Sequence, residues 1–365
     1  MRIAHIAPFA PCRCGLFEAA RDMARADINI GHEVYFIDSG ITVSDKREQP
    51  IVGGVDDRAG FKVITADPAN IKLADVIVLH TGIPDEWLTG IKAPIVWVIH
   101  ARPLAAFRPA QNRGIDSFFY ASIMKQPQIK KAVFFWPELE PYWKIVIPEE
   151  KLYAFDYPVV DEHRFSPTGE KHIVGKEHLG KFNGLICDSW REDIDIYETV
   201  CGAIEAARNI PGLKWHLYAF DNPVPECWTY LIDELKRLGA MGELCARMPD
   251  MEKVYRGFDF LLTPHRIVTR VIGEALSCGL PVIAANGCKV AQETADISDP
   301  HSVADAVKRM VNRITDSRGL VKGLALMEAR KFNLNAFGAQ MNRLYQEIGG
   351  ISNESKDASA LRING

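Results

Sequence analysis

Short apolar segments recur along the chain and alternate with segments whose apolar residues have helical spacing. In the first half they lie at 2–7, 32–38, 61–65, 76–79, 95–99 and 118–121. Their apolar character is nearly continuous, which is typical of parallel strands that are covered on both faces. Between the first two segments, Ala20, Met23, Ala24 and Ile28 recur at helical spacing and predict a helix over about 17–30. The first half therefore predicts a doubly wound parallel α/β domain.

The pattern of strands and helices starts again near residue 184. Strands are expected at 184–188, 214–220, 258–262 and 282–285, and amphipathic helices at 302–314 and 334–348 close the pattern. We therefore expect two Rossmann-like domains in tandem, at 1–165 and 170–330, with the carboxyl ends of their strands facing a central cleft. The segment 157–167, rich in proline and polar residues, is expected to be a hinge, and the polar tail 351–365 is expected to be mobile.

The segment 270–284 carries the most specific local signal. It predicts a helix containing small residues, a helix stop at Gly279 with positive φ, and a buried strand that starts with Pro281. The free amides at the start of a helix beside such strands attract phosphate. Glu274 lies one turn into the helix, where its carboxylate could accept hydrogen bonds from ribose hydroxyls. The segment therefore predicts a nucleotide site.

Composition agrees with two domains in one chain of 365 residues, which is too long for one ordinary core. The apolar content of 47% and charged content of 25% are those of a soluble globular protein, and the net charge of −4 gives no overall attraction for nucleic acid or an acidic membrane. The eight cysteines are scattered without a disulfide framework, and Cys12 and Cys14 lack zinc-ligand spacing, so no metal site is expected. We expect no signal peptide and no transmembrane segment, and hence a cytoplasmic protein.

Several motifs occur together in an order that is found in one family of enzymes. They are Gly31-His-Glu-Val34, the segment 95–100, the crossing segment 151–167, the segment 255–264, the segment 274–284 (Glu-Ala-Leu-Ser-Cys-Gly-Leu-Pro-Val-Ile-Ala) and the segment 331–345. The set resembles the GT-B glycosyltransferases of the retaining group 1, or family four, type over about residues 1–348. The resemblance implies metal-independent transfer, with retention, of a sugar from a nucleotide-diphosphate sugar to an acceptor hydroxyl.

The same resemblance assigns a role to each domain. The second domain would hold the nucleotide-sugar, for which a UDP-sugar is favoured, and no further cofactor is required. The first domain would bring the acceptor, and a final helix at about 332–348 would return to it.

The chain departs from the family pattern at three places. The first of the family's two glutamates, which contacts the transferred sugar, is replaced by Arg266. Arg191 matches a family cation that binds the diphosphate, but no lysine accompanies it at the expected spacing. The usual pair of glycines in the first loop is reduced to Gly15. These departures indicate an atypical branch and leave the donor sugar open.

Sugar transfer requires positive charge near the leaving diphosphate, and guanidinium groups supply it without a metal. Arg191 and Arg270 are the candidates, with Arg266 as a substitute. His100 ends a strand and either contacts the donor sugar or acceptor or is an ordinary core histidine. The candidate catalytic residues are therefore His100, Arg191 and Arg270, and the candidate donor-binding residues are Gly15, Arg191, His265, Arg266, Arg270, Val271 and Glu274.

The identity of the acceptor is left open by the sequence. Candidate acceptor-side residues are Gly15, Glu18, His80 and Arg102. Between residues 102 and 131, six basic residues stand against one acidic residue, with phenylalanines interleaved. This pattern fits a solvated surface over core phenylalanines. It also fits a patch for an anionic acceptor, such as DNA with hydroxymethylated bases or an anionic lipid.

Two other classes of function stay open. One is a nucleotide-sugar epimerase or hydrolase with the same fold. The other is a non-catalytic nucleotide-sugar-binding protein, which the replacement of the family glutamate by Arg266 would explain. The sequence determines neither the donor base nor the oligomeric state.

Overall fold

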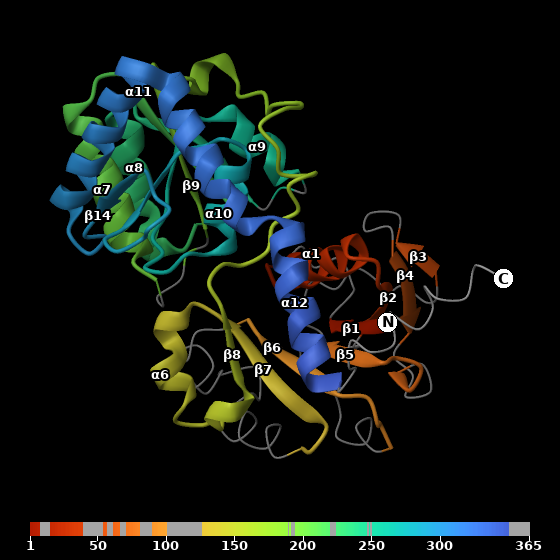
Figure 1. Ribbon diagram of the computed structural model, residues 1–365. Helices are drawn as coiled ribbons and strands as arrows, with labels where there is room; N and C mark the ends of the chain where they lie inside the picture. The colour runs from red at the N-terminus through yellow and green to blue at the C-terminus, as the bar shows by residue number, and fades with distance from the viewer. Residues whose placement is uncertain are drawn as a thin grey trace. The chain divides into compact units, whose positions relative to one another are not determined.

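The computed structural model describes residues 1–7, 15–38, 54–56, 61–65, 71–80, 90–100, 126–188, 190, 194–219, 224–246, 248 and 250–349. The chain divides into two compact units, which we call the first and second domains (Figure 1). The first domain comprises Met1–Asp156 and Leu334–Gly365, and the second comprises Tyr157–Asn333. The final helix of the chain is therefore part of the first domain.

The first domain is built on an eight-stranded sheet with the order β3-β4-β2-β1-β5-β6-β7-β8. Neighbouring strands are parallel except for β3 and β4. The strands are β1 (Arg2–Ala7), β2 (Glu33–Asp38), β3 (Gly54–Asp56), β4 (Phe61–Thr65), β5 (Val76–Leu79), β6 (Ile95–Ile99), β7 (Ile129–Phe135) and β8 (Leu152–Phe155). Because β1 pairs with β2 on one side and with β5 on the other, the strand order reverses beside β1, as in a doubly wound sheet.

The central strands of this sheet are buried along their whole length. Every residue of β5 and of β6 is buried, which is the pattern expected of parallel strands covered on both faces. Alternate side chains of the two strands, such as Ile77 and Trp97, join Trp143 in one apolar cluster. The described helices of this domain are α1 (Gly15–Asn29), α6 (Glu140–Trp143) and α12 (Leu334–Gly349), with 3-10 turns at Pro137–Leu139 and Glu149–Lys151.

Helices α1 and α12 pack closely because glycine occupies position 338. A Cβ atom at Gly338 would lie 2.7 Å from the carbonyl oxygen of Ala26, so a larger residue would push the helices apart. The Tyr345 hydroxyl on α12 donates a hydrogen bond to Asp27 Oδ2 on α1 at 2.7 Å. These contacts explain why the last helix of the chain completes the first domain.

The second domain is a parallel six-stranded sheet with the order β11-β10-β9-β12-β13-β14. Its strands are β9 (Phe182–Cys187), β10 (Leu213–Tyr218), β11 (Met241–Cys245), β12 (Phe260–Leu262), β13 (Val282–Ala285) and β14 (Glu293–Ala295). Its described helices are α7 (Ile196–Asn209), α8 (Thr229–Arg237), α9 (Met251–Gly257), α10 (Arg270–Ser277) and α11 (Pro300–Ala329), with 3-10 turns at Lys176–His178, Glu226–Trp228 and Arg330–Phe332. Leu261 and Leu262 enter two different apolar clusters, because successive residues of a strand point to opposite faces.

The structure confirms the local prediction for segment 270–284. Helix α10 ends at Ser277, Gly279 has a φ of 75°, and β13 follows as a fully buried strand. Gly273 also has a packing role, because a Cβ atom there would lie 2.5 Å from the Phe332 ring and 2.9 Å from Val160. The small residue lets α10 approach these neighbours closely.

Other elements differ from the expectation. Strands β3, β7, β8, β11 and β14 were not expected, and the helix expected at 302–314 is part of α11, which continues past a kink at Ser317. Strands β8, β11 and β14 lie at or near the sheet edges, and they are only partly buried, so their apolar signal is weak. The strand expected at 118–121 lies outside the described residues.

We expect the free energy of unfolding to depend on the protonation of His216, which is buried in β10. Its Nδ1 accepts a hydrogen bond from the Glu243 amide at 3.1 Å, and its Nε2 lies 3.3 Å from Asn183 Oδ1, an arrangement that suits the neutral ring. Burial lowers the pKa of His216 to about 4. The unfolded chain takes up this proton near pH 6.5, as a free histidine does.

The stabilisation that comes from neutral His216 is therefore complete above about pH 6.5 and is lost as the pH falls towards 4. The loss should reach about 3 kcal/mol. Urea unfolding of the wild type and of His216→Gln between pH 7.5 and 4.5 measures it. The variant should show a weaker dependence on pH, and equal slopes would contradict the assignment.

Candidate functional site

The second sheet reverses its strand order beside β9. Strand β9 pairs with β10 on one side and with β12 on the other, so successive connections leave it in opposite directions. In doubly wound sheets, ligands bind at the carboxyl ends of the strands beside such a reversal. The residues that follow β9 and β12 are therefore the first candidates for a binding site.

A histidine and an aspartate meet at this reversal. Asp188 follows β9, and His265 follows β12 after two residues. Because the two strands are parallel neighbours, their carboxyl ends lie at the same edge, and His265 Nε2 lies 2.6 Å from Asp188 Oδ2. Both side chains are only 9% exposed. The sequence indicated His265, whereas its pairing with Asp188 is evident only from the strand order.

Arg266 forms a second ion pair, with Asp195 just before α7. The Arg266 Nε atom lies 2.6 Å from Asp195 Oδ2, and the arginine side chain is 56% exposed. An exposed pair of this kind contributes less than about 1 kcal/mol to stability. Arg266 can therefore exchange its carboxylate partner for a phosphate at little energetic cost.

Arg270 and Glu274 form a more enclosed pair, one turn apart on α10. Arg270 Nε donates to Glu274 Oε1 at 2.6 Å, and both side chains are about nine-tenths buried. The Tyr255 hydroxyl on α9 donates to the other carboxylate oxygen at 3.0 Å. Burial, with nearby Cys187 and Glu274, raises the pKa of Tyr255 well above its usual value, so this hydroxyl keeps its proton. Glu274 is thus held in place inside the domain and does not extend into solvent.

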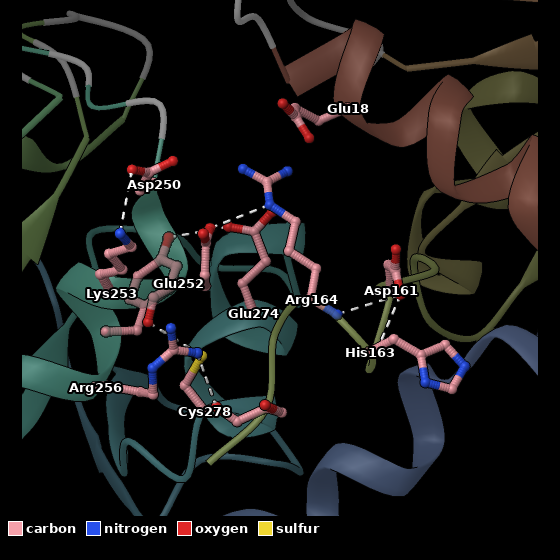
Figure 2. Close-up of polar contacts among 12 residues, drawn as sticks. Glu18, Asp161, His163, Arg164, Asp250, Glu252, Lys253, Arg256, Glu274 and Cys278 are labelled. Carbon is pink, nitrogen blue, oxygen red and sulfur yellow. Dashed lines mark hydrogen bonds and ion pairs between the residues drawn. The ribbon is translucent and has the colours of Figure 1, made fainter. Parts of the chain in front are cut away.

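Arg164 adds a further cation beside this pair. Figure 2 shows its side chain next to Glu274 and Glu252, and its Nε donates to Glu252 Oε2 at 3.1 Å. Its backbone amide and that of His163 donate to Asp161 Oδ1, at 3.4 Å and 3.0 Å, which shapes the turn that carries it. Sequence analysis missed Arg164, because it lies in the segment interpreted as a hinge. The sequence signal that could have identified it is the Arg164-Phe165 pair that follows Asp161.

The first domain brings two of the other candidates together. His80 follows β5 and His100 follows β6, and His80 Nδ1 lies 2.9 Å from His100 Nε2. Gly15 is the first residue of α1, and Glu18 in the first turn of that helix pairs with Arg21 at 2.6 Å. Arg191 and Arg102 lie outside the described residues, as does most of the basic segment 102–131.

The last residues of that basic segment are described by the structure, and Lys131 among them contacts other residues of the first domain. Lys131 lies within β7, and its Nζ atom is 2.7 Å from a Glu347 carboxylate oxygen on α12 and 3.1 Å from the Glu150 carbonyl. This lysine therefore has a structural role in the first domain. Lys130 is exposed.

Two further observations concern metals and membranes. Among the residues described, there is no cluster of three or more His, Cys, Asp or Glu side chains that could hold a metal ion. No helix in the described ranges has both the length and the apolar character that crossing a membrane requires.

Comparison with known proteins shows similarity in structure. No protein-family model matches the sequence, and no curated protein matches it. A glycosyltransferase from Rickettsia africae has 15% identity and a TM-score of 0.67, with 96% of this chain and 99% of that chain covered. Anabaena HepE in complex with UDP and glucose has 11% identity and a TM-score of 0.67, with 95% and 100% covered. Sucrose-phosphate synthase from Thermosynechococcus elongatus has 13% identity and a TM-score of 0.65, with 96% and 100% covered.

The sequence predicted two Rossmann-like domains. The two observed sheets, together with the similarity of nearly the whole chain to these solved structures, confirm that fold. The chain has the two-domain GT-B fold, with a Rossmann-like sheet in each domain. At this level of identity the likeness establishes the fold and not the reaction.

Proposed function

We propose that the chain is a glycosyltransferase that moves a sugar from a UDP-sugar to an acceptor hydroxyl. The observation that carries this proposal is that His265 and Arg266 follow β12 at the strand reversal of the second domain, while Arg270 and Glu274 form a pair on α10 of the same domain. It occurs in a GT-B fold, and a solved structure of that fold, Anabaena HepE, contains UDP and glucose. The second domain would hold the donor and the first would bring the acceptor.

The diphosphate of the donor would be bound by Arg266, Arg270 and the first turn of α10. The amides at the start of a helix, here including that of Val271, point to its N-terminal side. Guanidinium groups and helix amides stabilise the charge that develops on the leaving diphosphate without a metal. Arg191 would add a further cation. Retention of configuration rests on the family resemblance.

The ribose of the donor would bind to Glu274. Its carboxylate accepts one hydrogen bond from Arg270 and one from Tyr255, and a carboxylate has about four acceptor positions. The ribose hydroxyls would donate hydrogen bonds to this carboxylate. The two existing bonds would hold the carboxylate in a fixed orientation.

On the acceptor side, we assign His100 a direct contact with a reacting substrate. Gly15, Glu18, His80 and Arg102 would support that side of the reaction. The first-domain histidines lie at the carboxyl ends of β5 and β6, where ligands of doubly wound sheets bind.

A thermal-shift screen tests the proposed function. UDP and UDP-glucose should raise the melting temperature more than ADP or GDP, because a ligand at a hundred times its Kd stabilises the folded state by about 2.7 kcal/mol. The shift should persist in EDTA. No shift with any uridine nucleotide would contradict the proposal.

The reaction itself is tested by incubation with UDP-glucose. Release of UDP, with transfer of glucose to water or to an added acceptor, supports a transferase. Conversion of the donor to an epimer without release of UDP would assign the chain to the epimerase alternative. Binding without turnover, across a panel of UDP-sugars and hydroxyl acceptors, would indicate the binding-protein alternative.

A further inference from the structure

A segment beside the last strand of the second sheet combines basic residues with exposed apolar side chains. Strand β11 is at one end of the sheet order, and the segment 171–181 lies next to it. In this segment, His172 Nε2 lies 3.0 Å from Glu243 Oε2 in β11, and the 3-10 turn at Lys176–His178 packs against the same strand. The segment is therefore held on the second domain at the margin of its sheet.

Two large apolar side chains of this segment lie in solvent. Ile173 is 89% exposed and Leu179 is 46% exposed, although Val174 between them is buried. A single exposed aliphatic side chain is ordinary in a soluble protein. Here the two stand on either side of a basic turn, and segments that lie in a membrane interface combine apolar and basic residues in this way.

Lysines give the same segment an excess of positive charge. Lys171, Lys176 and Lys181 are exposed, and among the residues that the structure describes none of the three has an ion-pair partner. Glu177 is the acidic residue within the segment. Glu170, which precedes the segment, lies 2.6 Å from Lys253 and is neutralised by it. The lysines are therefore available to an anionic partner.

A hollow next to the segment brings more basic groups to this place. Its volume is about 320 Å3, and its lining includes basic His178, Lys214 and Lys236 and apolar Ile232, Met241 and Leu244. A Cβ atom at Gly180 would lie 2.7 Å from Lys214 Cγ, so the end of the segment lies directly against one of these lysines. Lys236 lies 3.4 Å from Asp233, whereas Lys214 has no ion-pair partner within the described ranges. Basic groups beside an apolar lining suit an anion that is joined to a hydrocarbon chain.

The chemistry of this surface favours a lipid over a nucleic acid. Proteins that bind single strands stack the bases on aromatic side chains, and the segment 171–181 contains no Phe, Tyr or Trp. Aliphatic side chains instead enter the boundary between headgroups and acyl chains, and lysines are attracted to anionic headgroups. Stable attachment to a membrane surface needs two signals of this kind together.

We propose that the segment 171–181 and the hollow beside it bind the surface of a membrane that contains anionic lipids. Ile173 and Leu179 enter the interface, and the lysines contact the headgroup phosphates. Each lysine near such a surface strengthens binding about fivefold, and salt weakens this contribution. The inference goes beyond the proposed function, because it concerns where the chain binds and not which group it transfers.

Flotation with phospholipid vesicles tests this surface in the full chain, without donor or acceptor. The protein should float with vesicles of phosphatidylcholine that contain about 30% phosphatidylglycerol, and it should not float with phosphatidylcholine alone. Sodium chloride at about 0.5 M should release most of it, because salt screens the lysines. Absence of binding to the mixed vesicles, or equal binding to both kinds, would overturn the proposal.

A charge-reversal variant locates the contact. Lys171→Glu/Lys176→Glu should weaken binding to the mixed vesicles at least about 30-fold. The matched control is Lys289→Glu/Lys308→Glu, which changes the net charge equally. Lys289 lies between β13 and β14 and Lys308 lies on α11, which packs against β14 at the other end of the sheet. The control should bind as the wild type does, and equal weakening by both variants would refute this surface.

A second pair of variants tests the apolar contact. Ile173→Ser should weaken binding about tenfold or more, because it removes the side chain that enters the interface. Ile145→Ser is the control, since Ile145 is 79% exposed on the first domain. Weaker binding of the control, with Ile173→Ser unchanged, would place the membrane contact elsewhere and contradict the proposal. All four substituted lysines and both isoleucines are exposed, so these variants are expected to fold.

Two further measurements separate this inference from its alternatives. Calorimetry with glycerol phosphate, or with single-stranded DNA, that shows binding by a protein which fails to float would assign the surface to a soluble anion or to nucleic acid and refute membrane binding. Flotation uses no nucleotide. A protein that floats but shows no thermal shift with uridine nucleotides would therefore keep this inference while the proposed function fails.

Discussion

Glu274→Ala is expected to lower the free energy of unfolding by about 3–5 kcal/mol, because it removes one partner of a buried ion pair. Arg270 would keep its charge at a position that is 11% exposed, and the Tyr255 hydroxyl would lose its acceptor. Both losses arise inside the second domain, where water cannot fully replace the carboxylate. Urea unfolding at pH 7.5 measures the change.

A matched control comes from an exposed pair on α8. Asp233 and Lys236 are an i,i+3 pair at 3.4 Å whose side chains are 71% and 63% exposed, so Asp233→Ala should leave the unfolding midpoint unchanged. The double variant Arg270→Met/Glu274→Gln should recover most of the lost stability, because it leaves no buried charge without a partner. A Glu274→Ala protein that unfolds at the wild-type urea concentration would show that the pair is not enclosed as described.

The same double variant separates stability from donor binding. We expect it to fold well and yet to lose the UDP-dependent rise in melting temperature, since both the ribose acceptor and a diphosphate cation are gone. A full UDP response in this variant would remove α10 from the donor site.

The second large effect is a weaker binding of UDP by the Arg270→Met variant, measured by calorimetry as an increase in the Kd. A hydrogen bond to a charged group contributes about 1.5–3 kcal/mol, so its loss should raise the Kd about 10- to 150-fold. The Arg270 side chain is the candidate because it lies at the start of α10 with Nε 2.6 Å from Glu274. Measurements should be made well below the melting temperature, because the variant also leaves Glu274 without its cation.

Arg318→Met is the matched control for this measurement. Arg318 also pairs with a carboxylate of the second domain, Asp259, at 2.7 Å, but it lies on α11 and is 63% exposed. Its replacement removes one positive charge and should leave the Kd unchanged. An equal weakening by both substitutions would mean that only the overall charge of the domain matters, which would contradict a specific diphosphate contact.

The candidate site was partly visible in the sequence. Gly279, Pro281 and the apolar run that follows predicted α10 and β13, because helix stops and buried strands are decided by neighbouring residues. The same segment placed Arg270 and Glu274 one helical turn apart, so their contact was a local consequence of the sequence. The strands beside them were also predicted from their apolar character.

The remaining partners of the site depend on strand order. Asp188 and His265 are 77 positions apart and meet because β9 and β12 are neighbours at the point where the sheet reverses. Arg164 reaches Glu252 across a separation of 88 residues. No periodicity in the sequence specifies such pairs, since periodicity reports only which face of an element is buried.

A row of three histidines in the first domain shows the same contrast between local pattern and strand order. His80 lies 2.9 Å from both His5 and His100, and His5 lies 2.9 Å from Asp27. Each of His80 and His100 follows an apolar strand, which made both of them candidates from sequence alone. His5 lies inside a buried strand, and Asp27 lies on the buried face of α1, where the apolar pattern hid them. Tyr345 is 318 positions from Asp27 and was not a candidate at all.

The sequence by itself determined the strands and helices with a strong apolar pattern, the two-domain fold, and the positions of Arg270 and Glu274 one turn apart on α10. Each of these follows from burial periodicity and capping over a few residues. The tertiary structure alone decided which carboxylate faces each cation, and that three histidines form one row ending at Asp27. The physical reason is that hydrogen-bond partners are set by sheet order, which joins Asp188 to His265 across 77 positions, and by the packing of α12 on α1, which joins Asp27 to Tyr345 across 318.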